Sequence, residues 1–170
     1  MVLQTLVGQW DRLNPTHGGS NASPFPLARA VHADAHSYMT FNTCYKDSGL
    51  FGLYLVAPPE GADAAYAATL AYLANLDESV DADSCARAKA QLKANVISQL
   101  DALAHVCEEI GRQFLTYDRR VPVAELLARV DAVSLDDLRA TARHFLKEKP
   151  HAQAAYGAIG GLRPHAGASV

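Results

Sequence analysis

The segment SYMTFNTCYKDSGLFG, residues Ser37 to Gly52, decides the fold. Aromatic and aliphatic residues dominate Ser37–Cys44 and also Leu50–Val56, a composition that is typical of β-strands. Between them Lys46–Gly49, with the sequence KDSG, supplies residues that tight turns prefer. The sequence therefore predicts a β-hairpin.

Helices are predicted on both sides of the hairpin, because apolar residues recur at spacings of three and four along much of the remaining chain. Pro58 and Pro59 end the second strand, and Ser134 with Asp137 three residues later forms an N-cap for the last helix. The predicted helices are Met1–Trp10, Asp63–Leu76, Asp81–Tyr117 with a break near Asp101–Ala104, Val123–Val130 and a segment from Ser134 to before Pro150, with a loop at Asn14–Pro26 and a last strand at His151–Gly160.

This order predicts an α+β fold, a layered domain in which helices pack on an antiparallel sheet. The length of 170 residues, 49% of them hydrophobic, fits one domain with one core. We expect that domain to span residues 1–162, with a tail over 163–170. The sheet would be small and the first helix begins without an N-cap, so we expect the N-terminal strands of the domain to precede Met1.

Charge and hydropathy argue against several partners. A formal net charge of −3 offers no basic excess, so no nucleic acid is expected. The longest apolar stretch, near Gly49–Ala57, is far shorter than the ~20 residues of a transmembrane helix, so no direct membrane span is expected. The three cysteines, Cys44, Cys85 and Cys107, are widely spaced, which favours reduced thiols.

Two histidine clusters are the strongest metal-ligand candidates. His105 shares a predicted helix face with Glu108 or Glu109, but a zinc site needs three protein ligands and this cluster holds one imidazole. His32 and His36 enter a predicted strand, where a rise of ~3.3 Å per residue would separate them by roughly 13 Å. We assign no metal ligand and expect the isolated chain to bind no stoichiometric zinc.

Motifs that would anchor other chemistry do not occur in the sequence. It contains no Gly-x-Ser-x-Gly nucleophile elbow, no Gly-x-x-x-x-Gly-Lys phosphate loop and no Gly-x-Gly-x-x-Gly dinucleotide loop. No catalytic residue is assigned, and the residues alone predict an α+β domain without a self-contained active site.

Two longer segments carry a family resemblance: Ser37–Gly52, and Glu108–Pro122 with the sequence EEIGRQFLTYDRRVP. Both resemble the C-terminal domain of the pitrilysin family, in its branch of mitochondrial processing peptidase β subunits and complex III core proteins. Met1–Arg12, Arg87–Lys93 and Ala128–Val133 look like the same domain. The resemblance therefore covers roughly residues 1 to 162.

The resemblance implies a role inside a larger assembly. In this family two subunits, each with two similar domains, enclose a chamber where presequence peptides are cut. The zinc is held by a His-x-x-Glu-His motif in the first domain of the β subunit, a motif that this sequence lacks. The chain is thus expected to carry no zinc cofactor and not to be catalytic alone. Implied partners are an α-type peptidase or core subunit, presequence peptides and, for a core protein, other complex III subunits, in the mitochondrial matrix or on the matrix side of the inner membrane.

The resemblance also places the hairpin in the sheet that faces this chamber, where family members contribute a tyrosine near the substrate peptide. Tyr45, and after it Tyr38, are the residues to which this substrate-binding role carries over, with a plain strand-core position as the alternative. Two other functions stay open. Beside the structural, chamber-lining role, the chain could form part of an active zinc metalloendopeptidase whose zinc domain comes from a missing N-terminal half or a partner. The other alternative is a stand-alone assembly or peptide-binding module.

Gly111, Arg119 and Arg120 lie within the second family segment. Glycine costs about 1 kcal/mol relative to alanine inside a helix, so Gly111 predicts close approach of another backbone element and overpacking in Gly111→Leu. The two arginines predict a charge cluster at a helix end, where Arg120→Ala should change stability little.

Overall fold

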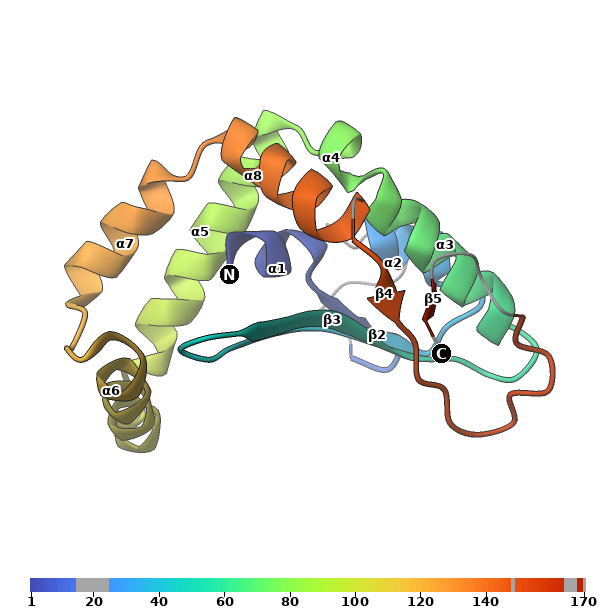
Figure 1. Cartoon of the computed structure of the whole chain (residues 1–170), viewed down its shortest axis with the longest axis horizontal. Coiled ribbons are helices and arrows are strands. Elements are labelled where there is room, and N and C mark those ends of the chain that lie inside the picture. The colour runs from blue at the N-terminus through green and yellow to red at the C-terminus, as the bar shows by residue number, and fades with distance from the viewer. Residues whose placement is uncertain (15–24, 148, 164–167, 170) are drawn as a thin grey trace.

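The computed structural model describes residues 1–14, 25–147, 149–163 and 168–169. Its main sheet has three antiparallel strands in the order β1 (Gln9–Asp11), β2 (Ser37–Cys44) and β3 (Gly49–Val56), as Figure 1 shows. β2 and β3 pair along their whole length, from Ser37 opposite Val56 to Cys44 opposite Gly49. The predicted hairpin is confirmed, with the second strand beginning one residue earlier.

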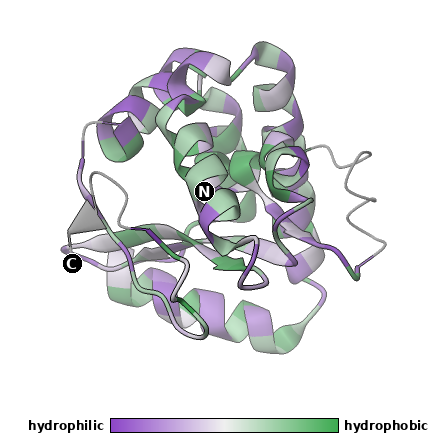
Figure 2. Ribbon diagram, turned by 90° about the vertical axis from the view of Figure 1, so that its right-hand side faces the viewer, coloured by the Kyte–Doolittle hydropathy of each residue, from purple (hydrophilic) through white to green (hydrophobic). Residues whose placement is uncertain are grey.

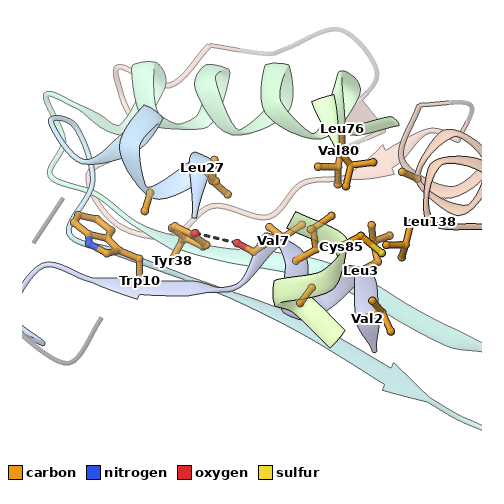
Figure 3. Close-up of a cluster of buried hydrophobic side chains, with 14 of the residues drawn as sticks. Val2, Leu3, Val7, Trp10, Leu27, Tyr38, Leu76, Val80, Cys85 and Leu138 are labelled. Carbon is orange, nitrogen blue, oxygen red and sulfur yellow. Dashed lines mark hydrogen bonds between the residues drawn. The ribbon is translucent and has the colours of Figure 1, made fainter. Parts of the chain in front are cut away.

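Helices cover one face of this sheet (Figure 1). α1 (Val2–Val7) and α2 (Pro26–Val31) pack nearest to the strands, and they contribute fully buried Val7, Leu27 and Val31 to the core. Trp10 of β1 and Tyr38 of β2 meet these residues from the sheet side (Figure 3). The layered α+β class is confirmed.

The remaining helices follow the predicted order. The long helical run breaks between Gln99 and Leu103, as the sequence predicted. Ser134 and Asp137 form a capping box in which each side chain bonds to the other's backbone N–H. No helix in the described ranges is both long and apolar enough to cross a membrane. These helices are α3 (Ala62–Ala74), α4 (Leu76–Ser79), α5 (Ala82–Gln99), α6 (Leu103–Tyr117), α7 (Val123–Ala132) and α8 (Leu135–Ala142), which continues into a π-helical turn at Arg143–Lys147.

Both ends of the chain differ from the prediction. The first helix stops at Val7 because Gly8 adopts a φ of 74°. Gln9 and Trp10, which were predicted to be helical, lie in β1 instead. Only two residues of the expected last strand are extended, in β4 (His151–Ala152), which pairs in parallel with β5 (Ala168–Ser169) away from the main sheet. The alternation over His151–Gly160 rests on alanines and glycines, which bury too little apolar surface to specify a strand.

The predicted N-terminal loop lies mostly outside the described residues, which omit 15–24. Its C-terminal end is helical, because Pro26 stands in the first turn of α2, where proline's fixed φ is compatible with a helix. At the other end of the chain, the backbone N–H of Arg163 donates to the carboxylate of Asp63 at 2.9 Å, which attaches the start of the predicted tail to α3.

Residues 103–122, here called the α6 arm, lie apart from the other helices. Figures 1 and 2 both show α6 below the level of the sheet, opposite the helical layer. Gln113 is the buried residue of α6, and its side chain accepts from the N–H of Val121 at 2.7 Å and donates to Glu109 at 2.9 Å. A Cβ at Gly111 would meet no described neighbour within 4 Å, so the predicted close approach at Gly111 is wrong for this chain.

Candidate substrate-facing surface

The two faces of the hairpin have different environments. Tyr38 and Thr40 of β2 point toward the helices and are buried, as strand alternation requires. The alternate residues form the opposite face, and Met39 lies across from Tyr54 while Phe41 lies across from Gly52. We call this surface the open face; it comprises Met39, Phe41, Leu50, Tyr54 and Val56, of which Met39, Leu50 and Tyr54 are 49%, 60% and 63% exposed.

Gly52 shapes the open face. A Cβ at Gly52 would overlap the ring of Phe41 on the neighbouring strand, so the missing side chain leaves room for that ring to lie across the sheet. Phe41 is consequently half-buried while its neighbours on this face stay exposed. The open face is therefore an exposed apolar and aromatic surface.

Thr40 and Gln4 fix the hairpin to the N-terminal helix. The Thr40 hydroxyl lies 2.7 Å from the carbonyl of Gly8 and 3.2 Å from that of Gln4, and the Gln4 amide donates to the carbonyl of Thr40 at 3.2 Å. Because these bonds join the end of α1 to the middle of β2, the open face is held on a rigid element.

Tyr38 lies in the core. Its side chain is 2% exposed and its hydroxyl donates to the carbonyl of Val7 at 3.0 Å. Burial raises the pKa of the Tyr38 phenol well above its ordinary value. The structure thus places Tyr38 in the strand-core position that the sequence left open, with its hydroxyl already bonded.

Tyr45 follows β2 at the end of the hairpin and is 62% exposed. Its N–H donates to the carbonyl of Ser48 at 2.9 Å and closes the predicted turn. Next to it, Lys46 forms an ion pair of 3.6 Å with Asp118, the left-handed residue that ends α6. Both groups are well exposed, so the pair adds little stability, but it brings the hairpin end and the α6 arm together.

Met39, Leu50 and Tyr54 were not among the residues assigned a role from sequence. The signal that could have found them is the period of two along the strands. Once Tyr38 is a core residue, Met39 must point the other way, and the hairpin register then brings Tyr54 beside it.

The histidine clusters do not assemble ligand sets. His32 ends α2 and its Nδ1 lies 2.8 Å from the carbonyl of Arg29, within its own helix. On α6, the carboxylate of Glu108 accepts from Arg112 at 2.7 Å, and that of Glu109 accepts from Gln113. Within the part of the chain that the structure describes, no three His, Cys, Asp or Glu side chains come close enough to hold a metal ion.

Comparison with known proteins identifies the family. The sequence model of the family described as "Peptidase M16 inactive domain" matches residues 1–92, more than half of the 170 residues. The chain belongs to this family. The resemblance seen in the sequence is thus confirmed, and the matched range includes α1, the whole hairpin and α3.

Individual relatives extend the match beyond the family range. The chain is 41% identical over 161 residues to the "Mitochondrial-processing peptidase subunit beta" of Bos taurus, covering 94% of this chain and 32% of that protein. It is 38% identical over 159 residues to the "Probable mitochondrial-processing peptidase subunit beta, mitochondrial" of Arabidopsis thaliana, covering 94% of this chain and 30% of that protein. The chain therefore spans about a third of the length of these relatives.

A solved structure supports the fold. A chain of "Complex III2 from Candida albicans, Inz-5 bound" superposes with a TM-score of 0.77 at 22% sequence identity, covering 84% of this chain and 34% of that chain. At this identity the likeness concerns the backbone arrangement alone. It agrees with the helix-covered antiparallel sheet described above.

Proposed function

We propose that this chain is the C-terminal, zinc-free part of a β-type mitochondrial processing peptidase or complex III core subunit, and that its open face is a wall for substrate peptides. The observation that carries the proposal is the apolar surface on the uncovered side of the hairpin, in a chain 41% identical to a processing peptidase β subunit. An uncovered surface of this kind is typical of an interaction site.

The chemistry of the open face suits an extended peptide. Met39 and Leu50 offer flexible apolar contacts, and Tyr54 adds a phenol ring that combines apolar surface with a hydrogen-bonding hydroxyl. Exposed Tyr45, at the end of the hairpin beside the open face, offers a second phenol ring. None of these groups acts as a nucleophile, base or metal ligand in the proposed role. The zinc and the general base would come from a His-x-x-Glu-His motif, which this sequence lacks, on the family's first domain.

The proposed partners follow from the same assignment. An α-type subunit would close the chamber over the open face, and in the core-protein form other complex III subunits would bind as well. The location would be mitochondrial, in the matrix or on the matrix side of the inner membrane. An active metalloendopeptidase would result where an N-terminal zinc domain joins the chain, covalently or as a partner.

A stand-alone peptide-binding module is the second candidate, and one observation favours it. β3 is the edge strand of the main sheet, so the side of β3 away from β2 offers backbone groups to an added strand in the described structure. Binding by strand addition depends on backbone groups, whereas binding on the open face depends on side chains.

The test measures binding of a fluorescently labelled presequence peptide by anisotropy. We expect Tyr45→Ala and Tyr54→Ala to weaken binding about three- to tenfold, since each removes a contacting ring. The matched control is Tyr156→Ala, because Tyr156 is an exposed tyrosine that lies in the C-terminal segment, outside the hairpin. Equal affinities for all three variants and the wild-type chain would refute the open-face assignment. If Tyr45→Ala and Tyr54→Ala keep the wild-type affinity and Leu53→Pro in β3 loses it, the result would favour the strand-addition module.

A further inference from the structure

A large groove lies between α3 and α5, on the helical side of the domain and away from the open face. We call it the α3–α5 groove. Its volume is about 850 Å³, within the range of small-molecule sites, and its lining is mainly apolar. The groove is also lined by buried residues of α1, α4 with its C-cap, and α5, so the core itself forms its floor; these are Leu6, Leu76, Val80 and Ala88.

The margins of the groove are formed by small side chains. Ala71 of α3 and Ala90 and Ala94 of α5 line it and are exposed. Alanine methyl groups leave the space between the two helices open, where longer side chains would fill it. The opening between the helices therefore stays accessible to an apolar group.

Among the residues that the structure describes, Arg87 is the charged residue that lines the groove, and none of the lining residues is acidic. One guanidinium nitrogen of Arg87 donates to the Ser84 hydroxyl at 3.0 Å, and Asp81 nearby attracts its charge. The Asp81 carboxylate is itself occupied as the N-cap of α5, where it accepts from the N–H of Ser84 at 2.7 Å. The guanidinium thus keeps further donors for a ligand at the margin.

The other polar groups at the groove differ in availability. The Asn75 amide donates to the carbonyl of Ala71, and the Gln91 amide donates to Asn95, so both are bonded within their own helical segments. The Tyr72 hydroxyl has no hydrogen-bond partner in the described part of the chain. Burial raises the pKa of Tyr72 to about 12, so the phenol stays a neutral donor at physiological pH.

We propose that the α3–α5 groove binds a single-chain amphiphile with an anionic head group, a long-chain carboxylate, with Arg87 contacting the head. A cation at the margin of an apolar groove, whose described lining holds no carboxylate, complements one negative charge on an alkyl chain. Nothing in this binding depends on the peptide-facing role proposed for the open face, which lies on the other side of the sheet.

The test titrates the full chain with laurate below its micellar concentration and measures heat of binding. We expect one-to-one binding of laurate, and at least about tenfold weaker binding of dodecyltrimethylammonium, which has an alkyl chain of similar length and the opposite charge. Arg87→Ala should weaken laurate about tenfold and leave dodecanol unchanged, and Arg87→Lys should recover most of the laurate affinity.

A steric pair locates the ligand. Ala90→Trp should weaken laurate binding strongly by obstructing the groove margin, whereas Ala86→Trp, which changes an exposed alanine of α5 that does not line the groove, should bind like wild type. Ala71→Trp should obstruct the groove from the α3 side in the same way. A far-UV circular dichroism spectrum that matches that of the wild-type chain shows that each variant is folded. No laurate binding to the wild-type chain would overturn the proposal. So would equal affinity for all three head groups, or equal binding by Ala90→Trp and Ala86→Trp.

Discussion

Two regions of the molecule are built from amphipathic segments: the sheet together with α1 and α2, and the α6 arm. They differ in what covers their apolar residues. Around the sheet, Val7, Leu27 and Val31 are fully buried. On α6, Leu103 and Leu115 are 87% and 79% exposed. Periodicity thus predicts that a helix forms and which residues share a face, but it does not predict whether another element of the same chain covers that face. Two glycines, Gly8 and Gly111, provide the sharpest comparison.

Gly8→Ala should have the largest effect. Gly8 has φ 74° and ψ −156°, a backbone region that is essentially restricted to glycine, and a Cβ there would overlap the ring of Phe25. We expect a loss of about 2 to 4 kcal/mol in the free energy of unfolding, measured by urea denaturation. In Gly8→Ala combined with Phe25→Leu, the part of this loss that comes from the steric overlap should be relieved, and the part that comes from backbone strain should remain. A change below about 0.5 kcal/mol in the single variant would contradict this account.

Tyr38→Phe should have the next largest effect. It removes the hydroxyl that donates to the carbonyl of Val7 and leaves that carbonyl buried without its partner. The expected cost is about 1 to 3 kcal/mol in the same measurement. Tyr54→Phe, on the opposite face of the same hairpin, is the control and should leave stability unchanged because Tyr54 is exposed. Equal stability of the two variants would mean that the Tyr38 bond contributes nothing measurable.

Local signals explain which elements the sequence predicted. The hairpin, the break before Leu103 and the capping box at Ser134 depend on turn residues, periodicity and a cap within a few residues of each other. β1 was missed because three residues are too few for a pattern, and it forms only because β2 lies beside it. The candidate site was half predicted: the family resemblance pointed to Tyr45, but the open face required knowing which strand face the helices cover.

Glu125 connects the α6 arm to α7 and should make a smaller, pH-dependent contribution. The Arg119 guanidinium, with Arg129 as a second partner, lowers the pKa of the Glu125 carboxyl from 4.5 to about 2. A folded-state pKa below the unfolded value stabilises the fold above pH 4.5, and this stabilisation is lost as the pH falls toward 2.

Glu125→Gln should therefore lower the urea midpoint at pH 7, and the gap from wild type should close between pH 4.5 and 2. Because these side chains are partly exposed, the gap should be smaller than that for Tyr38→Phe. Arg120→Ala is the control, since Arg120 forms no ion pair within the described residues, and its midpoint should match wild type at both pH values. A gap that is constant with pH would contradict the ion-pair assignment.

Gly111→Ala should have the smallest effect, and of opposite sign to Gly8→Ala. Gly111 lies inside α6, where alanine is the better helix former, and no described atom would meet its new Cβ within 4 Å. We expect a gain of about 0.5 to 1 kcal/mol in the isolated chain, and no overpacking in Gly111→Leu. Both variants should also be measured in a complex with an α-type subunit. If a partner element packs against the exposed side of α6, Gly111→Leu should weaken the complex while the isolated chain stays stable. Destabilisation of the isolated chain by either variant would mean that α6 has a close neighbour within the chain itself.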